Sequence, residues 1–155
     1  MPNFKPITSS NNIREVVKSA FDVNLELTGA WGYKKEESTV LQGNHNNLPL
    51  NQFEHTLASM RAYLEMNMTQ VKKDRYGSIN LNEISRENYD DNGLTYHEVN
   101  YEITAMKDED YATFINEYKE GYGKEEFDLN DHFKRRKEKT LTRTVKHWFE
   151  VSRVL

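Results

Sequence analysis

The sequence predicts an α+β fold in which an antiparallel sheet of about four or more strands is covered on one face by helices. Apolar residues recur at helical spacing over 51–71, whereas other segments alternate with a period of two. The third observation is Asp91-Asn92-Gly93, a strong hairpin-turn signal. Since the strands are hairpin-linked, we expect a two-layer packing, with a curled sheet or partial barrel as the alternative.

The first residues combine prolines with small polar side chains, which predicts a flexible N-terminal tail over 1–10. We expect 11–155 to form a single α+β domain. The domain begins with a short amphipathic helix, because Asn12 and Glu15 fit a capping box. Its apolar face is made of Ile13, Val16, Val17, Ala20 and Phe21.

A strand is expected next, since Val23, Leu25 and Leu27 alternate with polar residues. A second short strand around Val40 is expected to pair back onto it. The central helix then begins at Asn51, which fits an N-cap with Glu54 three residues later. Its apolar stripe consists of Phe53, Leu57, Met60, Leu64, Met68 and Val71.

The third strand begins near Ile79, and the Asn-Gly turn returns the chain into a strand from Val99 to Ala105. An aromatic helix is expected from Asp108 to about Tyr122. A C-terminal amphipathic helix is expected from near Asp128 almost to the terminus. Its buried side is predicted to be Leu141, Val145, Trp148, Phe149 and Leu155.

Composition excludes several chemistries. The chain has no cysteine, so disulfides, thiolate nucleophiles and Fe–S clusters are absent. The five histidines show no metal-ligand spacing, and no cofactor motif is present, so we expect neither a metal nor a cofactor. We also expect no secretory signal and no membrane span, and therefore a cytoplasmic location.

Charge is distributed unevenly along the chain. Residues 131–155 hold eight Lys and Arg against three Asp and Glu, a net charge of +5 in a chain of net charge −4. On the predicted last helix, Arg135, Lys139 and Arg143 fall at i, i+4 and i+8 and would line one exposed stripe. This stripe predicts contact with an acidic protein surface, although a merely solvated helix face fits it too. Overall acidity disfavours nucleic acid, and a homodimer is left open.

Glycines flank Trp31 at positions 29 and 32. The pattern Gly29-Ala30-Trp31 resembles the signature of the calycins, the lipocalin and avidin-like ligand-binding barrels, over Leu27–Gly32 only. The resemblance implies a ligand pocket, which we place between sheet and helices around Trp31, Tyr33 and Tyr101. A buried tryptophan that anchors the core is the other interpretation.

Two functional hypotheses follow. The first is a non-enzymatic interaction protein that contacts an acidic partner through its basic C-terminal helix. The second is a small-molecule-binding or hydrolase-like domain with a pocket near Trp31. No nucleophile–base pair is identifiable, so catalytic residues stay unknown and the sequence favours binding over catalysis.

Overall fold

The computed structural model describes residues 4–8, 12–44, 46–68 and 70–155. Its helices are α1 (Ile13–Phe21), α2 (Leu50–Tyr63), α3 (Asp108–Gly121) and α4 (Leu129–Lys139). Its strands are β1 (Leu27–Gly29), β2 (Thr39–Leu41), β3 (Tyr76–Asp91), β4 (Leu94–Lys107) and β5 (Leu141–Glu150). Short helical turns lie at Lys35–Glu37, Leu64–Met68 and Lys72–Asp74. The α+β class is confirmed.

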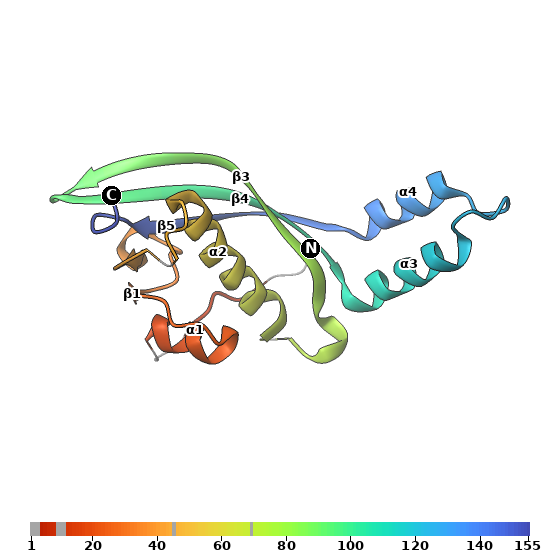
Figure 1. Cartoon of the computed structure of the whole chain (residues 1–155), viewed down its shortest axis with the longest axis horizontal. Helices are drawn as coiled ribbons and strands as arrows, with labels where there is room; N and C mark the ends of the chain where they lie inside the picture. The colour runs from red at the N-terminus through yellow and green to blue at the C-terminus, as the bar shows by residue number, and fades with distance from the viewer. Residues whose placement is uncertain (1–3, 9–11, 45, 69) are drawn as a thin grey trace.

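The five strands form one open sheet in the order β1-β2-β5-β4-β3. All neighbouring pairs are antiparallel except β2 and β5, which pair in parallel through Thr39↔Phe149 and Val40↔Glu150. The prediction of a wholly antiparallel sheet is therefore wrong at this pair. The sheet curves but does not close into a barrel (Figure 1).

The predicted C-terminal helix is wrong, because Leu141–Glu150 is strand β5. Leu141, Val145 and Trp148 fit a helical face, but the same segment also alternates and contains β-branched Thr142 and Thr144. Pairing with β4 along its whole length decides between the two patterns. Only α4, in the first part of the predicted helix, is helical.

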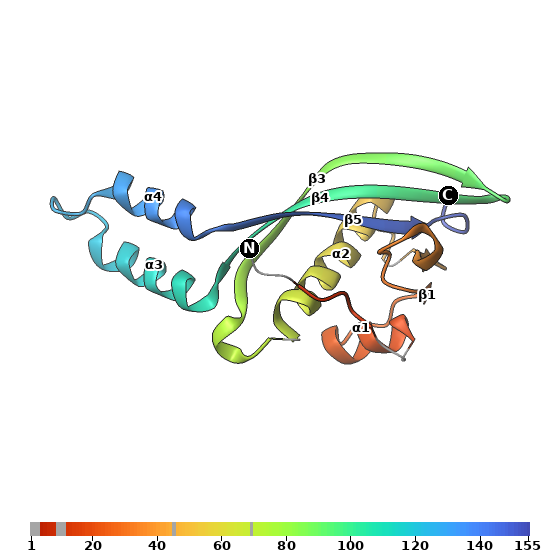
Figure 2. The ribbon, with the colours of Figure 1, turned by 180° about the vertical axis from the view of Figure 1, so that it is seen from behind.

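Helices α1 and α2 lie on one side of the sheet, whereas α3 and α4 extend beyond its end and cover neither face (Figures 1 and 2). The coverage by helices is thus only partial. We call α3, α4 and the connection between them the arm. The arm joins the end of β4 to the start of β5, so these two strands form a very long hairpin.

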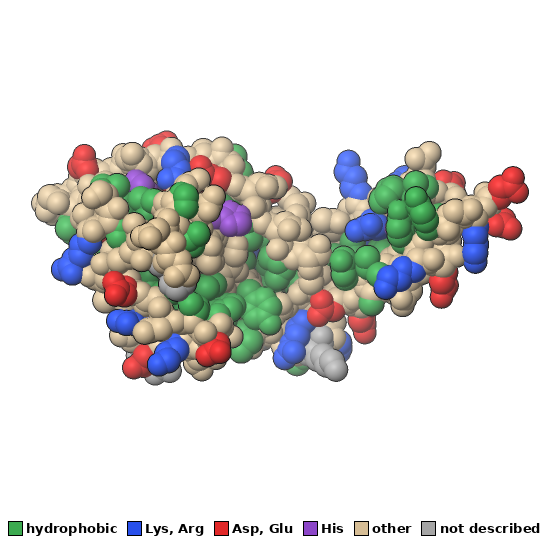
Figure 3. All heavy atoms as spheres, in the orientation of Figure 1, with side chains coloured by type: hydrophobic (Ala, Val, Ile, Leu, Met, Phe, Trp, Pro, Cys, Tyr) green, Lys and Arg blue, Asp and Glu red, His purple; other side chains and the backbone are tan. Residues whose placement is uncertain are grey.

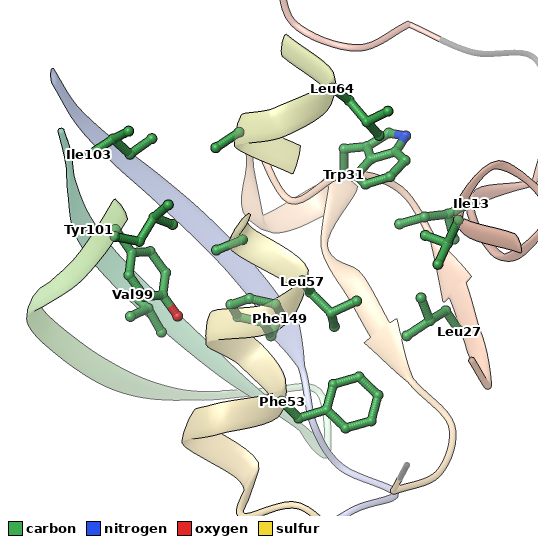
Figure 4. Close-up of a cluster of buried hydrophobic side chains, with 14 of the residues drawn as sticks. Ile13, Leu27, Trp31, Phe53, Leu57, Leu64, Val99, Tyr101, Ile103 and Phe149 are labelled. Atoms are coloured by element: carbon green, nitrogen blue, oxygen red, sulfur yellow. The ribbon is translucent and has the colours of Figure 1, made fainter. Parts of the chain in front are cut away.

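The core lies between α2 and the sheet, as the helical stripe predicts. Leu57 and Leu64 are buried, and the stripe ends before Met68 and Val71, which are exposed. Figure 4 shows the side chains of α2 between those of β4 and β5 on one side and those of α1 and β1 on the other. The opposite sheet face carries polar residues, with Asn82, Glu102 and Thr144 side by side.

The hairpin turn at Asn92-Gly93 is confirmed, since both residues have the positive φ angles (52° and 80°) that the turn requires. Of the predicted tail, residues 1–3, 9 and 10 lie outside the described ranges. Phe4 and Ile7 pack against the core. Flexibility of the tail stays a prediction.

Candidate functional site

A cavity of about 430 Å³ lies beside Trp31 and Tyr33. Its walls come from the N-terminal segment, α1 and the loop after β1. The lining residues are Pro6, Ile7, Thr8, Ile13, Gly29, Ala30, Trp31, Tyr33, Lys34 and Glu37. We call this space the Trp31 cavity. Its size lies within the range typical of small-molecule sites.

Glycines position Trp31 at the cavity. Gly29 and Gly32 have φ angles of +82° and +78°, which side chains other than glycine rarely adopt. A Cβ on Gly29 would lie 2.3 Å from the Ser38 carbonyl oxygen, and one on Gly32 would lie 2.2 Å from Cδ2 of His147. The glycines that the sequence singled out are therefore required by the fold, because backbone passes close to neighbours on both sides of Trp31.

Tyr33 ties the cavity to the core. Its hydroxyl donates to Oε2 of Glu65 at 2.5 Å and accepts the backbone N–H of Ile7 at 3.0 Å. Burial and the neighbouring Glu65 carboxylate raise the pKa of Tyr33, so the hydroxyl keeps its proton at neutral pH. The hydroxyl of Tyr33 thus holds the N-terminal wall of the cavity in place.

Arg61 of α2 supports this wall from the interior. It donates to the carbonyl oxygens of Trp31 at 3.1 Å and Lys146 at 2.8 Å, and its Cζ lies 4.6 Å from the Tyr33 ring centre. Burial lowers the pKa of Arg61, and the nearby Glu65 carboxylate opposes that shift. Sequence analysis missed Arg61 and Glu65, although Arg61 stands within the apolar stripe of α2, where a charged residue signals a buried partner.

His147 of β5 lies behind the loop, fully buried and stacked on Phe149 with ring centres 4.1 Å apart. The Thr39 hydroxyl donates to the Ala30 carbonyl oxygen at 2.7 Å, so His147 Nε2, 2.9 Å away, carries the hydrogen and donates to Thr39. Nδ1 of His147 has no hydrogen-bond partner in the described part of the chain. Burial, together with the Arg61 charge, holds the pKa of His147 well below its usual value.

Tyr101 does not line the Trp31 cavity. It lies on β4, across α2 from Trp31, beside His55, with 5.9 Å between the ring centres (Figure 4). The predicted grouping of Trp31, Tyr33 and Tyr101 is therefore corrected to Trp31 and Tyr33. The alternation of β4 correctly placed Tyr101 inward, but the sequence held no information on which side of α2 it would face.

Near Tyr101, α2 and the sheet share a buried ionic cluster that sequence analysis also missed. The fully buried Glu54 carboxylate accepts hydrogen bonds from His97 Nδ1 at 2.7 Å and from Arg86 at 3.1 Å. Arg86 also pairs with Glu83, which lowers the pKa of that carboxyl. Since each charge has a partner, this cluster fixes α2 on the sheet.

The predicted basic stripe is not continuous in space. Arg135 lies on α4 and pairs with Glu117 of α3 and with Asp131. Arg143 lies on β5 and pairs with Glu65 at 3.0 Å. Lys139 is the last residue of α4. The helical spacing failed because the chain becomes extended after Lys139.

No group of three or more potential metal ligands occurs within the described ranges. None of the helices there has the length and apolarity needed to cross a bilayer.

Comparisons of the chain with protein-family models, with curated proteins and with solved structures found no match.

Proposed function

We propose that the protein binds a small amphipathic molecule in the Trp31 cavity. The observation that supports the proposal is a cavity of about 430 Å³ at the position where the glycine-flanked tryptophan indicated a pocket. Apolar walls with a few polar groups are typical of ligand sites, and here Ile7, Ile13 and Trp31 supply apolar surface.

Two charged residues define the polar end of the proposed ligand. Lys34 and Glu37 line the cavity, and neither forms an ion pair within the described part of the chain. An ammonium without a protein partner attracts an anionic head group, and a free carboxylate attracts a cationic one. We therefore expect a ligand with an apolar body and a charged or zwitterionic head. The hydroxyl of Tyr33 is already bonded to Glu65, so the proposal is binding rather than catalysis.

Calorimetric titration with decanoate and with decylamine tests this function. Binding of decanoate should weaken at least about tenfold in Lys34→Glu, because the carboxylate then meets a like charge. Lys18→Glu is the matched control, because Lys18 is an exposed lysine on α1 outside the cavity. Absence of heat with both amphiphiles, or equal weakening in the two variants, would refute the proposal.

A second candidate function is contact with an acidic macromolecular partner through α4. The observation that favours it is the set of α4 cations without an ion pair in the described residues: Lys134, Arg136, Lys137 and Lys139. Arg135 and Arg143, which the sequence assigned to this role, are paired within the chain and contribute less. Lys139 keeps its proposed role.

A further inference from the structure

The arm extends away from the rest of the protein (Figures 1 and 3). It has a small aromatic core of its own. His132 is buried there among the rings of Phe114, Tyr118 and Phe127. Hydrophobic side chains also gather on its outer surface, as Figure 3 shows. Among them, Tyr122 is 67% exposed, Phe133 is 48% exposed and Leu129 is 40% exposed. Exposed apolar side chains that gather in one patch are typical of interaction surfaces.

The two helices of the arm carry opposite charge. Helix α3 has five acidic residues against one lysine, and α4 has five basic residues against two acidic ones. Within the arm, only Glu117 of α3 pairs with α4, through Arg135 and His132, as far as the described residues extend. Most of the other acidic side chains of α3 and of the other cations of α4 are exposed, so the two helices present opposite net charge to solvent.

A groove of about 570 Å³ lies on the acidic side of the arm, between α3 and the connection to α4. Its charged lining residues are Glu120, Glu126, the ion-paired Glu117 and one cation, Lys124. Neither Glu120 nor Glu126 has an ion pair among the described residues. The groove therefore offers unpaired carboxylates to a cationic side chain from outside.

We infer that two copies of this chain associate through their arms, with α4 of each copy against the acidic α3 and groove of the other. This inference rests on the second candidate function and names its partner. A foreign acidic partner would cover α4 but would be repelled by α3. A second copy pairs both helices, because in a two-fold contact the pairing of α4 with the α3 of the other copy occurs twice.

The size of the arm predicts a weak, reversible dimer. A helix of 14 residues is about 21 Å long, and two adjacent helices are about 20 Å wide, so one face offers about 400 Å² in projection. Stable complexes bury about 800 Å² per partner. We therefore expect dissociation in roughly the micromolar range, with strong dependence on salt.

Sedimentation of the full chain from about 5 to about 500 μM tests the inference. The double variant Lys134→Glu/Lys137→Glu gives α4 a net negative charge, as α3 has. The double variant Glu120→Lys/Glu126→Lys makes the groove basic, because Lys124 lines it too. Each variant alone should weaken association at least about tenfold, because like charges then meet. An equimolar mixture of the two should restore a dimer, since each reversed patch finds its complement. A variant that failed to fold would not recover on mixing.

Lys5→Glu/Lys18→Glu is the matched control, because it reverses two exposed lysines outside the arm and should leave the dimer unchanged. A wild-type monomer at every concentration, or a mixture that stays monomeric, would overturn the inference. Binding to immobilised polyglutamate tests separately whether α4 contacts an acidic partner, which is the second candidate function. The wild type could stay monomeric and still bind polyglutamate, with the binding lost in Lys134→Glu/Lys137→Glu. That result would support contact of α4 with an acidic partner and would refute the dimer.

Discussion

The guanidinium of Arg61 lies over the ring of Tyr33, with its Cζ 4.6 Å from the ring centre. This contact joins the central helix to the loop that carries Trp31, and two hydrogen bonds from Arg61 to backbone carbonyl oxygens reinforce it. The shape of the Trp31 cavity therefore depends on a buried charge that does not itself line the cavity.

Replacing Arg61 by Met should lower the free energy of unfolding by about 3 kcal/mol, because the carbonyl oxygens of Trp31 and Lys146 lose their charged donor and the buried Glu65 loses a nearby positive charge. Chemical denaturation measures the loss. Arg75→Met is the control, since Arg75 is exposed and should change stability by less than about 0.5 kcal/mol. Equal stability of the two variants would show that Arg61 does not hold the loop.

Gly32→Ala should destabilise the fold far more than Gly93→Ala. Both glycines have φ near +80°, so both substitutions cost about 1 kcal/mol of backbone strain. Only at Gly32 does a Cβ also meet His147 and the Trp148 carbonyl oxygen, whereas at Gly93 nothing lies within 4 Å. We expect the difference in unfolding free energy between the variants to exceed about 2 kcal/mol. Similar losses would mean that the approach to His147 is not tight.

Stability should fall in mild acid because of His147. Its pKa is held below the usual 6.5 in the folded chain, so below pH 6.5 the unfolded chain binds a proton that the folded chain does not. One such group gives a slope of at most about 1.4 kcal/mol per pH unit. His147→Phe removes the titrating group, so its unfolding free energy should depend less on pH between 6.5 and 5 than that of the wild type. Parallel pH profiles would contradict burial of a neutral His147.

The arm has a different acid response. Hydrogen bonds from Arg135 and then His132 lower the pKa of Glu117 from 4.5 to about 2. A carboxylate with a depressed pKa stabilises the fold fully above 4.5 and loses that effect as the pH falls toward 2. The stability difference between wild type and Glu117→Gln should therefore shrink over this interval, measured by thermal unfolding at low protein concentration. A difference that did not change from pH 6 to 2 would contradict the ion pair.

The sequence correctly predicted those elements that depend on residues close together in the chain. The stripe of α2 and the Asn-Gly turn correctly gave the central helix and the longest hairpin, because both depend on residues close in sequence. The segment after Lys139 was misread since Leu141, Val145 and Phe149 satisfy either period. What makes it a strand is β4, whose paired residues run from Ala105↔Leu141 to Tyr96↔Glu150 and are therefore distant in sequence.

The candidate site was predicted in part for the same reason. The glycines around Trp31 indicated backbone in close approach, and the cavity lies there. The residues that complete it come from distant segments: Ile7 and Ile13 from the N-terminal part and Arg61 from α2. No spacing rule links these segments to Trp31, so their meeting depends on the tertiary fold. Likewise, no local pattern indicated that Arg143 would pair with Glu65, because Glu65 lies in a segment distant in sequence.

Quenching of tryptophan fluorescence by a bromine-bearing decanoate would decide whether the Trp31 cavity binds ligand. Trp148→Phe leaves Trp31 as the only tryptophan, and Trp31→Phe leaves only Trp148, which lies on the opposite face of the sheet. We expect saturable quenching in Trp148→Phe and none in Trp31→Phe, because bromine quenches only on near contact. Equal quenching in both variants, or none in Trp148→Phe up to millimolar ligand, would contradict a ligand site beside Trp31.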